Sequence, residues 1–338
     1  MATLAATKSD RARTSALADL IGRVRDNRLA YLYILPAFLI MAFITFYPIA
    51  YQVWMAFTDF GLKHLRLQNP DFIWFQNFAD IVSGNLPLTN YNFLRLLVFN
   101  ILWTFINVTL HVAIGVIMAL LLNVEGLPGK RIYRSLFVIP WALPALISGM
   151  MWHNLWHQNY GAINILLHQV TTLPPGVPDW LNDQNPVVNL PQIGVVLPLS
   201  FFAVLIANVW LGWPFMMVVA TGALQSIPKD LYEAAEVDGA NKWKQFWQVT
   251  LPLIRPAMIP AIMIGLMWTF NQFNIIYFVT GGGPVGLTEI LVTQGFKLVN
   301  PQAWYGVAAA FNIIVFGILG TITLTTNRIS RATEPYFA

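Results

Sequence analysis

The 338-residue sequence contains no cysteine and very little charge. Without cysteine, disulfide bonds, thiolate metal sites and a cysteine nucleophile are all excluded. Charged residues make up only 10% of the chain and hydrophobic residues 57%, whereas a soluble domain carries roughly 25% charged residues. The composition therefore predicts a polytopic membrane protein. The formal net charge of +4 then reflects the loops of such a protein and does not indicate nucleic acid binding.

Six apolar stretches are long enough to cross a hydrocarbon core, which takes about 20 residues. None of them contains Asp, Glu, Lys or Arg. A segment in lipid must satisfy its own backbone hydrogen bonds, so each is expected to be a helix. We predict an all-α polytopic membrane protein with six transmembrane helices, near residues 30–57, 96–123, 135–157, 196–222, 256–279 and 304–327.

Lys and Arg residues are distributed unevenly between the two sets of loops. Of the 19, only Lys63, Arg66, Arg95 and Lys297 fall on one side. The positive-inside rule therefore predicts that the N- and C-termini are cytoplasmic. The first apolar run is too long for a signal peptide, so we expect it to be retained. The predicted parts are a cytoplasmic arm (1–29), a six-span domain (30–328) with external loops 58–95 and 158–195 and a cytoplasmic loop 223–255, and a cytoplasmic tail (329–338).

The external loops are substantial, and either they cap the helical bundle or they receive an external partner. Prolines in 158–195 argue against one continuous helix there. Near the outer end of the third span, His153 and His157 are four residues apart, a spacing that can bind a metal. No carboxylate accompanies them, so we predict no metal site.

The cytoplasmic loop carries a motif with fixed spacing. Glu233, Ala234 and Ala235 are followed by Gly239, and the segment closes with Val249-Thr250-Leu251-Pro252. Ser226 is expected to cap a first helix, which Pro228 begins and Gly239 ends. A second amphipathic helix is expected to end at Pro252. The loop is thus either a docking hairpin or an interfacial hairpin without a partner.

This pattern resembles the EAA signature of the membrane subunits of ABC importers, with Val249 in place of the usual Ile. The resemblance implies a type I ABC importer permease fold, in which this loop seats in a cleft of an ATPase subunit. It assigns ATPase coupling to Glu233, Ala234, Ala235, Asp238, Gly239, Leu251 and Pro252. Among these, Glu233 and Gly239 are the residues expected to matter most.

The sequence lacks its own means of driving transport. Secondary transporters usually bury ionisable groups as ion relays, and apart from histidines the predicted spans have none. The Gly281-Gly282-Gly283-Pro284 run lacks the Gly-Lys-Ser/Thr ending of a phosphate loop and is expected to be a flexible turn. We therefore predict a transport subunit that is not an enzyme and carries no cofactor, with ATP and Mg²⁺ bound by partner ATPase subunits.

Neutral polar and aromatic residues concentrate in the second, fourth and fifth spans. Amides bond to hydroxyls and aromatic rings stack on sugar faces, so this chemistry suits a polyhydroxylated ligand. The alternative is hydrogen bonding between helices, which is common for Asn and Gln in bundles.

Longer stretches resemble the maltose permeases of the MalF type, among them 208–215, 221–228 and 280–284. The chain departs from them in having six spans and no very large external insertion. The resemblance implies sugar contacts at Asn208, Leu211, Gly212, Phe215, Gly265, Trp268, Thr269 and Gln272. At Gly265, Trp268, Thr269 and Gln272 the residues differ from the maltose pattern, so the residues do not distinguish maltose from other di- or oligosaccharides.

The resemblance also implies the partners. We expect a second permease, two ABC ATPase subunits, an extracytoplasmic sugar-binding protein and the lipid bilayer, but no nucleic acid, in the inner membrane of a prokaryote. Two alternatives are a facilitator that acts alone and an integral membrane enzyme. The first gives no reason for the 233–252 motif, and the second needs a cluster of acidic or metal-binding groups that the sequence does not show.

Overall fold

Long apolar helices dominate the structure, a computed structural model that describes residue 22 and residues 25–66, 69–88, 90–124, 126–172, 174 and 176–330. The chain divides into two units, Met1–Met55 and Ala56–Ala338. Most of the predicted arm (1–29) and residues 331–338 of the predicted tail lie outside the described residues.

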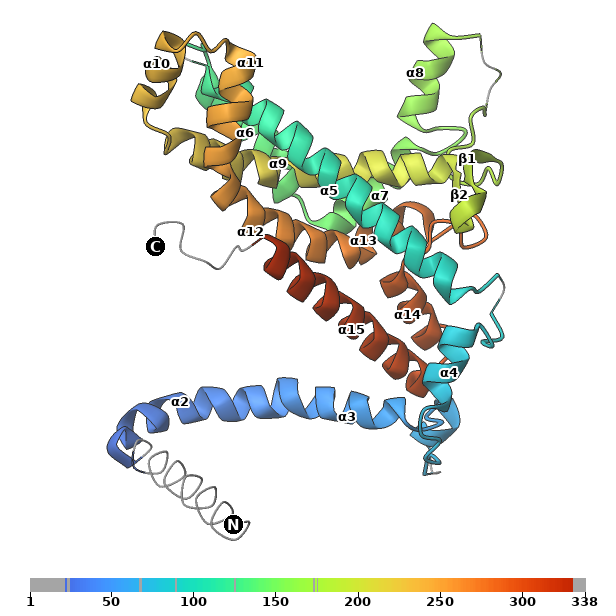
Figure 1. The fold of residues 1–338 in the computed structure, drawn as a ribbon. Helices are drawn as coiled ribbons and strands as arrows, with labels where there is room; N and C mark the ends of the chain where they lie inside the picture. Colours follow the sequence, from blue (N-terminus) through green and yellow to red (C-terminus); the bar gives the residue numbers. More distant parts are fainter. Residues whose placement is uncertain are drawn as a thin grey trace. The chain divides into compact units, whose positions relative to one another are not determined.

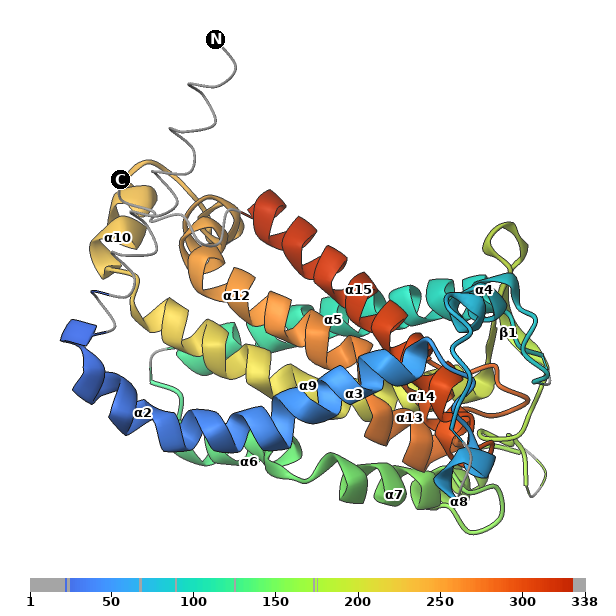
Figure 2. The same cartoon turned by 90° about the horizontal axis from the view of Figure 1, so that it is seen from below.

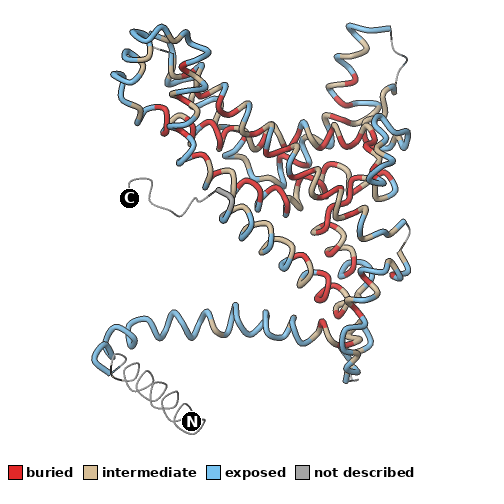
Figure 3. The backbone as a smooth tube through the Cα atoms, in the orientation of Figure 1, coloured by how far each residue is buried: buried red, intermediate tan, exposed pale blue. Residues whose placement is uncertain are grey.

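The first unit contributes one long helix. α2 (Arg28–Met41), the π-helical η1 (Ala42–Phe46) and α3 (Tyr47–Ala56) follow one another and form a continuous run of 29 residues. The most apolar window of this run has no buried residue, and Figure 3 shows the helix as exposed along nearly its whole length. This helix confirms the span predicted at 30–57, and its outward apolar side chains require lipid or another apolar surface.

The second unit is built around three neighbouring helices, α5 (Phe93–Asn123), α9 (Leu199–Gln225) and α12 (Leu251–Phe270), which run side by side in Figures 1 and 2. α5 and α9 approach closely because Gly115 has no side chain. A Cβ added there would lie 2.6 Å from the Cβ of Met216, and small residues permit such approaches in membrane bundles. α15 (Tyr305–Ser330) packs on α12. The predicted ends of α5, α9 and α15 agree with the structure to within one helical turn.

The third predicted span, 135–157, has a different shape in the structure. It consists of α6 (Lys130–Ala142) and α7 (Ala145–Leu155), which meet at an angle of 92°. Pro144 explains the break, because proline disfavours helical geometry in the residue before it and cannot donate a backbone hydrogen bond. Among the described residues, five helices are long and apolar enough to cross a membrane, or six if this bent pair counts as one span.

The fifth span begins earlier than predicted. α11 (Lys242–Gln245), the π-helical η4 (Phe246–Thr250), α12 and α13 (Phe273–Thr280) together form a run from Lys242 to Thr280. The prediction that Pro252 ends a separate amphipathic helix is wrong. Pro252 lies in the first turn of α12, where its missing N–H costs little. The loop that was predicted to be cytoplasmic is therefore joined to the membrane helix without a flexible linker.

Both of the loops that were predicted to be external, 58–95 and 158–195, contain structure of their own. The first holds η2 (Leu62–Leu65), α4 (Gln76–Ser83) and a bridge between Thr58 and Phe72. The second holds α8 (Ala162–Val170), η3 (Pro191–Ile193) and the antiparallel strands β1 (Pro186–Leu190) and β2 (Val195–Pro198), which confirms that it is not one continuous helix. The all-α prediction missed this hairpin, which β-branched valines favour in both strands.

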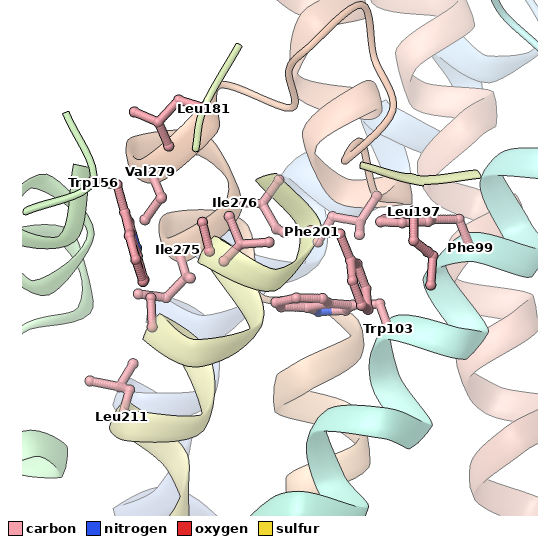
Figure 4. Close-up of a cluster of buried hydrophobic side chains, with 14 of the residues drawn as sticks. Phe99, Trp103, Trp156, Leu181, Leu197, Phe201, Leu211, Ile275, Ile276 and Val279 are labelled. Carbon is pink, nitrogen blue, oxygen red and sulfur yellow. The ribbon is translucent and has the colours of Figure 1, made fainter. Parts of the chain in front are cut away.

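The buried core of the second unit lies mainly where α5, α9 and α13 meet. Figure 4 shows Trp103 of α5 beside Phe201 of α9, with ring centroids 6.2 Å apart, and Trp156 facing Val279 of α13. This core fixes α9 against α5 and α13, and so positions the polar side chains described below.

The turn after α13 is tied by hydrogen bonds, although the sequence suggested a flexible one. Glu289 is only 4% exposed and forms an ion pair with Lys297 of α14 (Leu291–Val299). Lys297 also donates to the Gly281 carbonyl at 2.8 Å, and Thr293 donates to Glu289 at 2.5 Å. These bonds fasten α14 to the glycine turn.

Replacing Glu289 with Gln is expected to destabilise the protein. Lys297 would lose its carboxylate partner, and a charged hydrogen bond of this kind contributes about 1.5–3 kcal/mol. Thermal unfolding in detergent should show a lower midpoint. Lys63→Gln is the matched control, because Lys63 pairs with Asp59 at an exposed site, where ion pairs contribute little. An unchanged midpoint for Glu289→Gln would show that the Glu289–Lys297 pair does not hold this turn.

Candidate functional site

The 233–252 motif forms a helical hairpin. α10 (Lys229–Val237) is followed by Asp238 as its C-cap and then by Gly239, which has a φ of +77°. The Gly239 N–H donates to the Glu236 carbonyl at 3.0 Å, and the Ala240 N–H donates to the Ala235 carbonyl at 2.8 Å. This pair of bonds is a Schellman motif, which needs a left-handed residue and so favours glycine. The prediction that Gly239 ends the helix is confirmed.

The start of α10 differs from the prediction. Ser226 does not cap this helix; its hydroxyl donates to the Ala223 carbonyl at 2.7 Å and so closes α9. α10 begins directly after Pro228 with no side-chain cap. The sequence signal was ambiguous because the two helices are separated by only a short turn.

Side chains tie the two arms of the hairpin together. Glu236 accepts a hydrogen bond from Lys242 at 2.5 Å, and the buried Gln245 donates to the Ala240 carbonyl at 3.1 Å. Tyr232 and Thr250 hydroxyls lie 3.0 Å apart. Hydrogen bonds from Lys242 and Gln245 lower the pKa of Glu236. The carboxylate is therefore charged at neutral pH, and on acidification this tie is lost when the pH falls through that lowered pKa.

The hairpin leaves apolar side chains uncovered. Val237 is 88% and Trp243 69% exposed, and Leu231 and Trp247 are exposed as well. Of the residues assigned to coupling, Glu233, Ala234, Asp238, Gly239 and Pro252 are exposed, and Ala235 and Leu251 are half-buried. A groove with a volume of about 1490 Å³ lies beside the hairpin, lined by Glu233, Trp243 and the end of α5. A rigid hairpin with an uncovered apolar surface is suited to docking against another protein.

Three amides form a chain across the middle of the second unit. Asn208 of α9 donates to the Asn107 side chain of α5 at 2.7 Å, and Gln272 donates to the Asn208 side chain at 3.2 Å. His111 lies 3.1 Å from the Asn208 carbonyl. Asn208 is only 2% exposed. The structure thus brings Asn208 and Gln272 together, as the predicted set requires, and it also supports the alternative that these amides bond between helices.

The other predicted sugar contacts divide into packed and accessible residues. A Cβ at Gly212 would lie 2.3 Å from the His111 ring, and one at Gly265 would lie 2.7 Å from Met216, so both glycines permit close packing. Leu211 and Thr269 are buried. By contrast, Trp268 is exposed and Phe215 half-exposed, with ring centroids 5.5 Å apart. These two rings form the accessible part of the predicted set.

Three neighbouring residues were not in the predicted set. Trp103 donates its indole N–H to the Thr269 carbonyl at 3.2 Å, Asn107 bonds to Asn208, and the Trp141 ring lies 5.8 Å from that of Phe215. Asn107 could have been recognised from the sequence, because it is an amide inside an apolar span. The two tryptophans could not have been recognised in this way, since aromatic residues are common throughout this chain.

The two histidines considered for metal binding have partners within the protein. A ring nitrogen of His153 lies 2.7 Å from the Val279 carbonyl, and the His157 ring stacks on Tyr160. Across the part of the chain that the structure describes, no group of three or more His, Asp or Glu side chains is placed to hold a metal ion.

The structure combines a bundle of apolar helices, a rigid hairpin between two of them and a chain of neutral amides at their centre. These features define a membrane-spanning transport subunit. The inner membrane components of binding-protein-dependent transport systems match residues 111–327. The chain belongs to this family, and its place is the inner membrane.

Individual relatives agree with this assignment. The maltodextrin transport permease MdxF of Bacillus subtilis is 33% identical over 326 residues, which cover 93% of this chain and 72% of the relative. The trehalose/maltose transport permease MalF of Thermococcus litoralis is 30% identical over 310 residues, which cover 91% of this chain and 96% of the relative. A solved chain of a bacterial ABC transporter involved in the import of the acidic polysaccharide alginate has a TM-score of 0.73 at 19% identity, covering 93% of this chain and 98% of that one. It shows the same permease fold.

Proposed function

We propose that this chain is one permease half of an ATP-driven importer for a neutral di- or oligosaccharide. It pairs with a second permease, two ATPase subunits bind on the cytoplasmic side, and an extracytoplasmic binding protein delivers the sugar. The uncovered hairpin is the observation that carries this proposal. Because the hairpin continues into α12, movement of a docked ATPase would be transmitted to the helix that carries Trp268 and leads to Gln272.

The neutral character of the site supports the substrate class. The amide of Gln272 and the rings of Phe215 and Trp268 offer a hydrogen-bonding group and stacking surfaces without charge. The buried amides of Asn107 and Asn208, which continue the chain from Gln272, are neutral as well. Sugar hydroxyls match such groups, whereas a uronate carboxylate would lose its hydration here without gaining a cationic partner. The alginate transporter thus resembles this chain in fold, and its acidic substrate does not fit these side chains.

The substrate class has a direct test. The complex, purified with its binding protein and reconstituted, should hydrolyse ATP faster when neutral malto- or galacto-oligosaccharides are added. Acidic uronate oligosaccharides of equal length should not stimulate it. Equal stimulation by both series would contradict the neutral-sugar proposal. A chain that purifies alone and transports sugar without ATP would instead support the facilitator.

A further inference from the structure

The chain of amides from Asn107 through Asn208 to Gln272 has a fixed direction. The side-chain nitrogen of Asn107 donates to the Trp103 carbonyl, one turn earlier in α5, at 2.8 Å. A backbone carbonyl can only accept, so the Asn107 oxygen must face Asn208 and accept its bond at 2.7 Å. The Asn208 oxygen is then left for Gln272, which donates to it at 3.2 Å. Each amide thus sets the orientation of the next.

The chain ends at an oxygen without a partner. Because the Gln272 nitrogen bonds to Asn208, its Oε1 atom points away from the chain, and no hydrogen bond joins that atom to another described residue. Gln272 is half-buried. Some buried side-chain atoms in the described part of the chain lack a partner, but Oε1 is not one of them, so it has accessible surface. A ligand that reaches Oε1 must donate a hydrogen bond to it.

The backbone next to Gln272 is held by the same helix, α5. Trp103 donates its indole N–H to the Thr269 carbonyl, and Asn100 donates to the Phe270 carbonyl, both at 3.2 Å. These carbonyls belong to the last turn of α12, where a helix leaves carbonyls without a full set of helical partners. α5 therefore determines both where Gln272 lies and how its amide is turned.

Asn107 and Asn208 act from behind Gln272. They are 0% and 2% exposed, and each side-chain oxygen already accepts a bond from the next amide. A ring nitrogen of His111 lies 3.1 Å from the Asn208 carbonyl and holds the backbone that carries this amide. Any effect of Asn107 on a ligand must therefore pass through Asn208 and Gln272.

We propose that Asn107 is a positioning residue for sugar selection. Acting through Asn208, it turns the Gln272 amide so that Oε1 accepts a hydrogen bond from a sugar hydroxyl. This rests on the proposed function, since a sugar must reach the site. Without Asn107, the Gln272 amide would be free to present either its oxygen or its nitrogen. The site would then no longer distinguish a hydroxyl from a group that cannot donate, a distinction that fixed polar groups make strongly.

The test compares maltotriose with a series of maltotrioses in which one hydroxyl at a time is replaced by fluorine, which cannot donate. The complete complex is reconstituted with its binding protein, and the sugar concentration for half-maximal ATPase stimulation is measured. At one position, replacing the hydroxyl should raise this concentration about tenfold more in the wild type than in Gln272→Met. The preference of the binding protein is the same in both complexes and cancels.

Asn107→Leu should lose the same tenfold discrimination, although residue 107 is fully buried. Asn107→Ala is measured in parallel, because it removes the amide without adding a larger apolar group. Co-purification of the ATPase subunits and a response to unsubstituted maltotriose show that each variant is assembled.

The matched control is Thr104→Val. Thr104 is a buried polar residue of the same helix, and its hydroxyl donates to the Asn100 carbonyl one turn earlier. Its replacement should leave the discrimination at the wild-type level.

Two outcomes would overturn this proposal alone. In one, the wild type and Gln272→Met discriminate equally at every fluorinated position, so that Oε1 accepts no sugar hydroxyl. In the other, the Asn107 variants respond to maltotriose and keep the full wild-type discrimination, so that Asn107 only joins helices. If no neutral sugar stimulates the wild type, the proposed function fails and this proposal fails with it.

Discussion

Replacing Gly239 with Asp should abolish sugar import and separate the ATPase subunits from the membrane subunits. Gly239 has a φ of +77°, yet a Cβ added there would meet no atom within 4 Å. Within this chain the substitution therefore costs only the strain of the left-handed backbone. That strain is about 1–2 kcal/mol for most residues and less for Asp. A loss of more than about 100-fold in import would exceed that strain and would require a partner surface that closes over the turn.

Two further variants separate backbone strain from crowding and charge. Gly239→Asn has the size of Asp without its charge and tolerates a left-handed backbone, whereas Gly239→Val is strained there. If the partner closes tightly on the turn, all three variants lose co-purifying ATPase. If only Val fails, backbone strain is the cause, and the docking role of Gly239 is contradicted.

Replacing Asn208 with Leu should remove most of the sugar-stimulated ATPase activity. Asn208 links Asn107 to Gln272, so an apolar side chain leaves both amides without their shared partner. If the sugar-bound state depends on these two hydrogen bonds within the protein, each contributing about 1.5 kcal/mol, stimulation should fall about 100-fold. The measurement is the ATPase rate against sugar concentration with the binding protein present.

The matched control for Asn208→Leu is Asn154→Leu. Asn154 is an exposed amide on α7 that bonds only within its own helix, to the Met150 carbonyl. It should change neither stimulation nor assembly. Co-purification of the ATPase subunits with Asn208→Leu separates a lost sugar response from a failure to assemble. Unchanged stimulation in Asn208→Leu would show that the amide chain only joins helices.

The parts that the sequence predicted well are those with local causes. Apolar runs of about 20 residues must form helices in lipid, and α5, α9 and α15 lie where such runs occur. Gly239 was identified because a left-handed helix end favours glycine, and the structure places it in that geometry. Two of the three amides in the chain, Asn208 and Gln272, were identified through a family resemblance and do lie in contact.

The parts that the sequence missed depend on contacts between distant residues. Pro144 accounts for a break in the helix, but the local sequence does not give the 92° angle between α6 and α7. α7 packs on α13 and α9, which are distant from it in the sequence. Glu289 and Lys297 appear as ordinary loop charges in the sequence, but the fold brings them together in an ion pair whose carboxylate is buried. From the sequence, Ser226 could cap either neighbouring helix. In the structure its hydroxyl donates to the Ala223 carbonyl, so it caps the end of α9.

The most direct test of coupled sugar import reconstitutes this chain with its partner permease, ATPase subunits and binding protein in liposomes and follows labelled maltodextrin uptake. The account predicts uptake that requires ATP, stops in Gly239→Asp together with loss of the ATPase subunits, and loses its sugar response in Asn208→Leu. Uptake by this chain alone without ATP, unaffected by Gly239→Asp, would contradict it.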